Sequence, residues 1–185
     1  MVDNSLTFKS ASKTFSLASM KVAWYFSTNP DLLARVKANT RTTVSTLGMV
    51  ANDAALKEGE DWLDQLLVYL DGNHAFTESR IKERLPLLNY TKAQGTFLAW
   101  LDVSGLVDRI GAKETAARES MSSVDPVTAT DVVQRWVAEN AKVYLNPGAD
   151  YGTGGEARMR MNVGTSRKLI ERALDNMESA MARLG

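Results

Sequence analysis

The sequence predicts an α/β protein, because segments with strand patterns alternate with segments with helical patterns along most of its length. Strand patterns occur at residues 21–27, 96–103 and 158–163. Apolar residues recur at helical spacing in other segments, such as 60–85 and 131–140. The 185 residues, 44% hydrophobic and 24% charged, suffice for one domain core, or for one core and a small second lobe.

The composition excludes several classes of function. The 22 basic and 22 acidic residues cancel, so nothing indicates binding to nucleic acid or to an anionic membrane surface. The absence of cysteine excludes a disulfide framework, a thiolate metal site and a cysteine nucleophile. Because no run approaches the about eighteen apolar residues of a membrane span and no apolar signal region is present, we expect a cytoplasmic protein.

The first third of the chain is predicted to form one strand and three helices. Residues 21–27 form a buried strand, after which Asp31 caps a helix. Helical spacing resumes over residues 44–55 and is interrupted by Gly59. A long helix with an apolar stripe then follows over residues 60–85 and ends before a proline.

The only histidine, His74, falls on this long helix. A single histidine without a second ligand nearby is usually a surface or half-buried helix residue. We therefore expect neither a metal site nor a catalytic role for His74.

The middle of the chain begins with a turn at Gln94 and Gly95 and a strand over residues 96–103. Both faces of this strand are mostly apolar, which favours a central strand covered by helices. Residues 104–130 are polar and rich in turn residues and are expected to form a flexible loop, although residues 112–120 have the composition of a short helix. The elements expected next are a helix at 131–140, a strand at 143–145, a turn at 146–148, a glycine-rich segment at 151–155, a strand at 158–163 and a closing helix capped at 165–166.

The strand at 158–163 carries charge on one face only. Period two places Arg158, Arg160 and Asn162 on one face, opposite two methionines and a valine. An arginine on such a strand needs an anion, and its guanidinium fork suits either the α-carboxylate of a ligand or an internal Asp or Glu. The residues alone leave both possibilities open.

The segment Ser10–Phe15 has a lysine with a hydroxyl on each side. A nucleophilic Lys13 needs a carbonyl partner, and a carbonyl cofactor with a phosphate needs anion donors. Ser10 and Ser12 offer hydroxyl donors and Lys21 a positive charge, a set that suits pyridoxal phosphate. On the residues alone, such a segment is more often an ordinary solvated turn.

The segment Ser10–Phe15 resembles the cofactor-lysine segment of the class I/II aminotransferase superfamily, fold type I. Residues 58–70, 94–102 and 146–162 resemble, in the same order, the MalY/PatB branch, which contains cystathionine β-lyase-like carbon–sulfur lyases and enzymes labelled aminotransferases. In that family the lysine lies past the middle of a longer subunit. The chain is therefore similar to the C-terminal half of such an enzyme.

The resemblance implies the C-terminal portion of the fold type I fold, with residues 1–70 as the remainder of the large cofactor domain and the start of the interdomain helix, and 71–185 as a small C-terminal α/β domain. The implied cofactor is pyridoxal 5'-phosphate, bonded to Lys13 and held by Ser10, Ser12 and Lys21. Arg160 matches the arginine that binds the substrate carboxylate.

Five positions depart from the pattern of the family. Ser16 replaces a usual asparagine, Ser19 a usual glycine, and the pair Ala93 and Gln94 a usual Pro-Glu. Arg158 stands where the lyase branch has an apolar residue, and we expect it to form a surface ion pair or to widen preference toward acidic substrates.

The resemblance implies an enzyme that acts on amino acids by transamination or by carbon–sulfur β-elimination, as a homodimer. The alternative is a non-catalytic remnant or binding module that keeps only the C-terminal fold. Because the family's ring-stacking residue, pyridinium partner and main phosphate loop lie outside the matched stretches, we expect weak cofactor binding by this chain alone.

Overall fold

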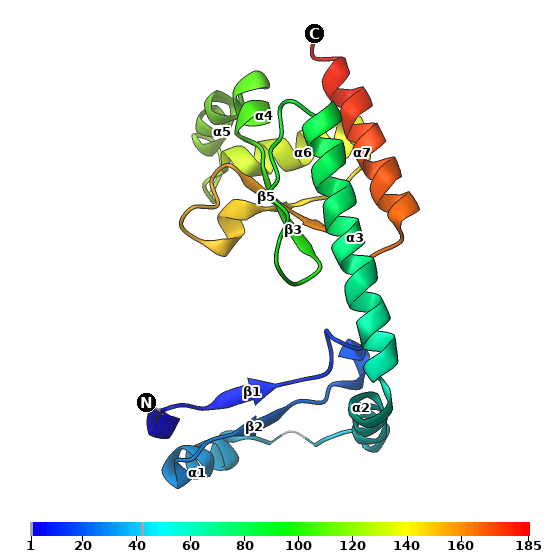
Figure 1. The fold of residues 1–185 in the computed structure, drawn as a ribbon. Helices are drawn as coiled ribbons and strands as arrows, with labels where there is room; N and C mark the ends of the chain where they lie inside the picture. The colour runs from blue at the N-terminus through cyan, green and yellow to red at the C-terminus, as the bar shows by residue number, and fades with distance from the viewer. Residues whose placement is uncertain (1, 42) are drawn as a thin grey trace. The chain divides into compact units, whose positions relative to one another are not determined.

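The computed structural model describes residues 2–41 and 43–185. The chain divides into two compact units after Leu67, here called the N-terminal unit (to Leu67) and the C-terminal unit (Val68–Gly185). The helix α3, Glu60–Arg84, contributes residues to both units (Figure 1). The assignment of these units to the cofactor domain and the small domain of the family stays a prediction.

The N-terminal unit is built on an antiparallel pair of short strands, β1 (Thr7–Lys9) and β2 (Trp24–Phe26). Lys9 pairs with Trp24, so residues 10–23 form the loop between the two strands. The remaining elements of this unit are the 3-10 turns η1 (Val2–Asn4) and η2 (Ala18–Met20), the helices α1 (Pro30–Asn39) and α2 (Thr46–Glu58), and the start of α3.

Two predictions for this unit are wrong in detail. The strand predicted at 21–27 is shorter and is not buried, since Phe26 is 53% exposed and β1 is its only sheet neighbour among the described residues. Asn29, and not Asp31, caps α1, because its side chain accepts hydrogen bonds from two backbone N–H groups of the first turn. Pro30 fits the first helical position because it has no N–H to satisfy, which places the cap at the residue before it.

The predicted break at Gly59 and the long helix after it are confirmed. Ser45 caps α2 by accepting the N–H of Gly48, and Gly59 ends the helix. The predicted apolar stripe of α3 is only partly buried, because Leu67 is 54% exposed. In the N-terminal unit the ring of Trp62 stacks on that of Phe15, with the ring centres 5.7 Å apart.

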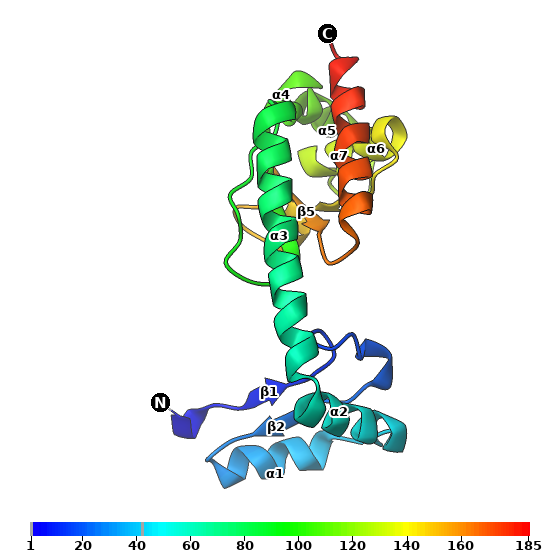
Figure 2. The same ribbon diagram turned by 45° about the vertical axis from the view of Figure 1, so that its right-hand side comes forward.

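The C-terminal unit has a three-stranded antiparallel sheet in the order β3-β5-β4. Helices pack around this sheet, and Figure 2 shows α3 and α7 running beside each other. The bounds are β3 Leu98–Asp102, α4 Ser104–Arg109, α5 Ala112–Ser120, α6 Ala129–Ala141, β4 Asn146–Pro147, η3 Gly148–Tyr151, β5 Arg158–Asn162 and α7 Arg167–Ala182.

The sheet confirms some predictions and corrects others. The strand β3 lies at an edge of the three-stranded sheet and β5 lies in the middle. The prediction that the strand at 96–103 is a central strand is therefore wrong. One face of β3 is only partly covered, since Trp100 is 39% exposed. The strand predicted at 143–145 is displaced to Asn146–Pro147, where backbone pairing with β5 extends into the predicted turn.

The segment 104–120 is helical and not a loop. Asp102 Oδ1 accepts the N–H of Ser104 at 2.9 Å, which satisfies one first-turn donor, so α4 begins directly after the strand. The predicted helix at 112–120 is confirmed as α5, and the helix predicted at 131–140 is confirmed within α6.

The core of the C-terminal unit confirms the two-faced pattern of β5. Met159, Met161 and Val163 are buried, whereas Arg158 and Arg160 lie on the opposite face. The closing helix α7 contributes buried residues, including Ile170, Leu174 and Met177, but Leu169, predicted to face inward, is 46% exposed. Over residues 2–41 and 43–185, no helix combines the length and apolar character needed to cross a membrane.

Candidate active site

The loop of Lys13 is closed by hydrogen bonds of two serines. Ser10 Oγ donates to the carbonyl of Val22 at 2.7 Å, and Ser12 Oγ lies 2.5 Å from Ser10 Oγ. Because the single hydroxyl proton of Ser10 is used at Val22, the hydroxyl of Ser12 is the donor in the serine pair. Lys13 follows directly in the turn and is exposed.

The two cations predicted to act here are both without an acidic partner. Neither Lys13 nor Lys21 forms an ion pair with any residue that the structure describes. Lys21 has a left-handed backbone conformation (φ 53°, ψ 43°) and precedes Val22, which is bonded to Ser10. The structure therefore brings the backbone of Lys21 next to the serine pair.

The departures of this loop from the family have different structural meanings. Ser16 has a φ of 56°, a left-handed conformation that asparagine adopts more easily than serine does. Ser19 lies in η2 with no positive φ, so its side chain brings no backbone strain.

Packing holds the loop on the side away from solvent. Ala11 is 4% exposed, and Phe15 stacks on Trp62. A hollow of about 560 Å³ beside the loop is lined by residues that include Ser10, Thr14, Trp24 and Leu63. Hydroxyl donors and two unpaired ammonium groups are a donor set that fits an aldehyde cofactor with a phosphate group.

Arg160 lies in a setting that leaves its charge unpaired. One guanidinium nitrogen donates to Asn146 Oδ1 at 3.1 Å, and the guanidinium carbon lies 4.7 Å from the centre of the Tyr151 ring. Tyr151 in turn meets Trp100 edge to face, with ring centres 5.6 Å apart. No Asp or Glu in the described part of the chain forms an ion pair with Arg160, so the alternative of an internal salt bridge is wrong.

Arg158 confirms the prediction of an ion pair. Its Nη1 lies 2.9 Å from Asp102 Oδ2, and the two residues are paired in the register of β3 and β5. Burial alone would raise the pKa of Asp102, but the hydrogen bonds from Ser104 and the charge of Arg158 outweigh it and lower this pKa below its usual value.

The glycine-rich segment positions Tyr151. Gly148 and Gly155 approach so closely that a Cβ on Gly155 would clash with the Gly148 carbonyl. This contact fixes the two ends of the turn that carries Tyr151 over Arg160.

His74 is buried, and not a surface or half-buried residue as predicted, since only 2% of it is exposed. Its Nε2 lies 3.1 Å from the carbonyl of Thr96, which can only accept, so Nε2 carries the proton. Its Nδ1 therefore accepts from the hydroxyl of Tyr90 at 2.6 Å, whose oxygen accepts the N–H of Ala93. Burial is the largest cause of the raised pKa of Tyr90.

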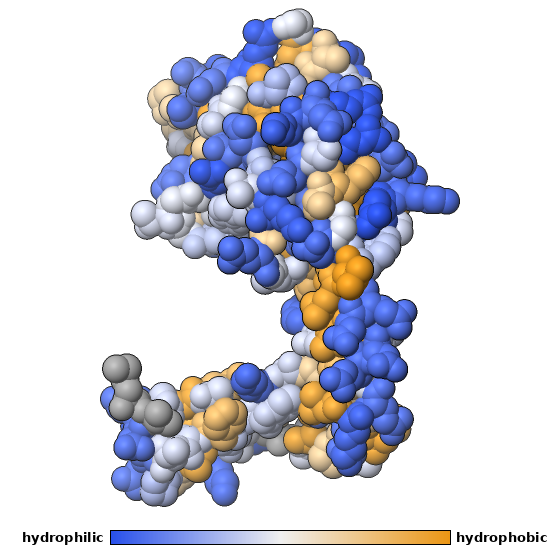
Figure 3. Space-filling view, viewed as in Figure 1, coloured by the Kyte–Doolittle hydropathy of each residue, from blue (hydrophilic) through white to orange (hydrophobic). Residues whose placement is uncertain are grey.

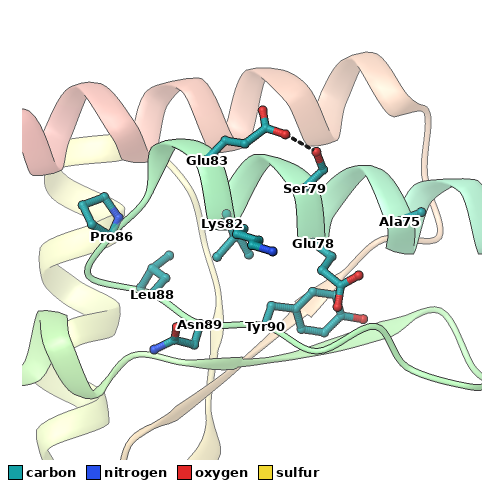
Figure 4. Close-up of a pocket in the computed structure, with 10 residues that line it drawn as sticks. Ala75, Glu78, Ser79, Lys82, Glu83, Pro86, Leu88, Asn89 and Tyr90 are labelled. Atoms are coloured by element: carbon teal, nitrogen blue, oxygen red, sulfur yellow. Dashed lines mark hydrogen bonds between the residues drawn. The ribbon is translucent and has the colours of Figure 1, made fainter.

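A second hollow, of about 870 Å³, lies along the later part of α3 (Figure 4). Part of its polar lining is paired, since Ser79 donates to Glu83 and Glu78 accepts the N–H of Lys92. None of the predicted site residues lines it, and no cluster of metal-binding side chains occurs within the described ranges.

Sequence reasoning missed the residues around Arg160. The pairing of β5 with β4 brings Asn146 beside the arginines, and its pairing with β3 brings Asp102 there. The glycine-rich turn brings Tyr151 there. The only available signal was the aromatic residue in the glycine-rich segment, because strand order and register are not encoded in local patterns.

Comparison with known proteins gives a consistent family. The model of the family "Aminotransferase class I and II" matches residues 1–177. Cystathionine beta-lyase of Corynebacterium glutamicum is 30% identical over 95% of this chain and 42% of its own length. Cystathionine beta-lyase PatB of Bacillus subtilis is 28% identical over 97% of this chain and 42% of its own length.

Solved structures support the same fold. Cystalysin of Treponema denticola, which contains pyridoxal 5'-phosphate, matches with a TM-score of 0.81 at 22% identity, over 100% of this chain and 43% of its own. The C-S lyase of Staphylococcus hominis matches with a TM-score of 0.80 at 24% identity, over 98% of this chain and 42% of its own.

The chain spans less than half the length of the curated relatives it matches, for example 42–44% in four of them. The predicted α/β fold, the C-terminal portion of the fold type I architecture, is confirmed by these neighbours. Since the family model covers nearly the whole sequence, this chain belongs to the aminotransferase class I and II family, and its relatives include the MalY/PatB cystathionine β-lyases.

Proposed function

We propose that this chain is part of a pyridoxal-phosphate-dependent enzyme that acts on amino acids, by transamination or by carbon–sulfur β-elimination of the cystathionine β-lyase type. The observation that carries the proposal is the loop of Lys13, which presents an unpaired lysine beside two bonded serines in a chain of this family. Relatives named as cystathionine beta-lyases and as C-S lyases support the chemistry.

Three residues of the loop, Ser12, Lys13 and Lys21, are the proposed cofactor ligands, and Ser10 positions Ser12. Ser12 can turn its hydroxyl proton from Ser10 to a phosphate oxygen, while Ser10 stays bonded to Val22. Lys21 adds a positive charge beside them, and Lys13 forms the covalent bond with the cofactor aldehyde. When bound, pyridoxal phosphate supplies that aldehyde and a ring that withdraws electrons from the α-carbon of the amino acid.

Arg160 is the proposed anchor of the substrate carboxylate. The Tyr151 ring attracts the charge of Arg160 without neutralising it, so the guanidinium can still pair with a carboxylate. Asn146 holds one edge of the guanidinium and limits its rotation. The α-carboxylate fixes the orientation of the amino acid and thereby the position of its α-hydrogen.

Lys13 is the proposed proton carrier once an amino acid has taken its place on the cofactor. Its neutral amine removes the proton from the α-carbon. In transamination Lys13 would return this proton to a carbon of the cofactor, and in β-elimination Lys13 would give it to the sulfur as the bond from the β-carbon to sulfur breaks, so that a thiol leaves. Nothing in the described residues favours one outcome over the other.

We also propose that the enzyme works as a homodimer in the cytoplasm. Large apolar side chains are exposed on the N-terminal unit, for example Phe8 at 65%, Leu47 at 76% and Val50 at 64%, and apolar surface is visible there in Figure 3. Apolar surface of this kind is typical of an interface. Sedimentation of the purified chain tests the proposal, and a monomer at all concentrations would contradict it.

The function is tested by two assays on one preparation with added pyridoxal phosphate. One follows 2-oxo acid formation from amino acids and the other thiol release from L-cystathionine. Both are run with the chain alone and with the N-terminal part of Bacillus subtilis PatB co-expressed. We expect activity in the second case, lost in Lys13→Ala and reduced in Arg160→Lys. Absence of activity in both cases would favour the non-catalytic alternative.

A further inference from the structure

The two arginines on the outer face of β5 lean toward opposite strands. Arg158 and Arg160 are two residues apart on one face, which places their Cα atoms about 7 Å apart. The guanidinium of Arg158 lies against Asp102 on β3, whereas that of Arg160 lies against Asn146 on β4. The strands β3 and β4 flank β5 on its two sides, so the two guanidinium groups diverge.

Asp102 is a fixed anchor for Arg158. Its Oδ1 accepts the N–H of Ser104 at 2.9 Å, and its Oδ2 pairs with Arg158 at 2.9 Å. Its backbone exchanges two hydrogen bonds with Asn89, of 2.9 and 2.8 Å. Carboxylate and backbone are thus both held, and Arg158 is the mobile member of the ion pair.

We propose that Asp102 is a specificity-determining residue: it holds Arg158 on the β3 side, so that a substrate meets one available guanidinium, that of Arg160. This inference rests on the proposed role of Arg160 as the anchor of the α-carboxylate. The site then favours amino acids with a single carboxylate over short dicarboxylic amino acids such as L-aspartate and L-glutamate.

The charge balance explains why Asp102, and not Arg158 alone, decides the preference. A second carboxylate of the ligand competes with Asp102 for the same guanidinium and gains little by displacing it. Removal of the Asp102 charge leaves Arg158 unpaired on the same face as Arg160. Two unpaired guanidinium groups, on residues whose Cα atoms lie about 7 Å apart on one face of a strand, then suit the two carboxylates of one short ligand.

A hollow beside the ion pair gives Arg158 room to move. It measures about 630 Å³ and is lined by residues that include Tyr90, Trp100, Asp102, Gly154 and Arg158. The side chains of Arg158 and Asp102 are 38% and 24% exposed, so the pair can open without unfolding the sheet. The ion pair is therefore a removable restraint on Arg158.

The test is a titration with two ligands of the chain whose arginines carry an isotope label. Binding is monitored through the Nε–H signals of the arginines in NMR spectra. Glutarate and butyrate are compared, because their carbon chains differ in length by only one carbon. Glutarate carries two carboxylates and butyrate carries one. The variants are Asp102→Asn, which keeps an acceptor for Ser104, and the double variant Asp102→Asn with Arg158→Met. Asp102→Ser replaces the first variant if that one does not fold.

We expect the wild-type chain to bind both ligands through Arg160, and to bind butyrate more tightly than glutarate. Asp102→Asn gains about fivefold for glutarate and nothing for butyrate, and the double variant loses the gain. Unchanged glutarate affinity in a folded Asp102→Asn chain, or a gain that persists in the double variant, would overturn the inference but leave the proposed function intact. If the Arg160 signal responds to neither ligand in any variant, the proposed role of Arg160 fails, and this inference with it.

Discussion

The guanidinium carbon of Arg160 lies 4.7 Å from the centre of the Tyr151 ring, a contact between a cation and an aromatic face. The ring attracts the charge without neutralising it, so the guanidinium can still pair with a carboxylate. Tyr151 is thereby a positioning residue for Arg160.

Replacement of Tyr151 by leucine is expected to weaken butyrate binding about twofold to fivefold, because the cation–π contact is lost and the guanidinium gains freedom. Tyr151→Phe keeps the aromatic face and is expected to bind as the wild type does. The NMR titration of the Arg160 signal measures both variants. Equal losses in the two would show that the hydroxyl, and not the ring, supports Arg160.

Replacement of Gly155 by alanine is expected to displace the turn that carries Tyr151. The added Cβ would clash with the Gly148 carbonyl, a backbone atom that cannot rotate away. Butyrate affinity should fall at least as far as in Tyr151→Leu. Gly95→Ala is the matched control, because its Cβ would meet nothing within 4 Å. Unchanged affinity in Gly155→Ala would show that the close contact does not hold Tyr151 in place.

Asp102 makes stability depend on pH in the acid range. Its pKa in the folded chain lies below the ordinary value of 3.8, so ionised Asp102 stabilises the fold above pH 3.8, and this contribution is lost as the pH falls through the lowered pKa. In urea unfolding, the wild type should therefore have a larger free energy of unfolding than Asp102→Asn at about pH 6, and this difference should shrink toward about pH 3. A difference that stays constant would contradict the lowered pKa.

The hydrogen-bond chain through His74 is expected to stabilise the C-terminal unit. Tyr90→Phe leaves His74 Nδ1 and the N–H of Ala93 without this partner, at a cost of about 1 to 3 kcal/mol in the free energy of unfolding. Tyr144→Phe is the matched control, because Tyr144 is 73% exposed. Thermal unfolding measures the stability of both variants. An equally small loss of stability in Tyr90→Phe and Tyr144→Phe would mean that solvent replaces the lost hydroxyl of Tyr90.

The parts of the structure that sequence predicted well are those fixed by local pattern. The alternation of Met159 and Met161 with Arg158 and Arg160 is encoded in the period of a strand, and the helix Ala112–Ser120 in its composition. Both are confirmed because burial of one face or local propensity decides them without reference to distant residues.

The parts that sequence could not predict depend on pairing between distant segments. Burial of His74 follows from Tyr90 and Thr96, which lie 16 and 22 residues away. The divergence of Arg158 and Arg160 follows from a strand order in which β5 lies between β3 and β4. Neither arrangement has a local signal, so the roles of Asp102 and Asn146 become visible only in the folded chain.

The most direct test of the account is reduction of the chain with borohydride after incubation with pyridoxal phosphate, followed by mapping of the modified lysine. Lys9 is a matched internal control, because it is an exposed lysine of the same hairpin. The account predicts modification concentrated at Lys13 over Lys9 and Lys21, and only scattered modification in Lys13→Ala. Equal modification of exposed lysines, with the same yield in Lys13→Ala, would contradict the assignment of Lys13 as the cofactor lysine.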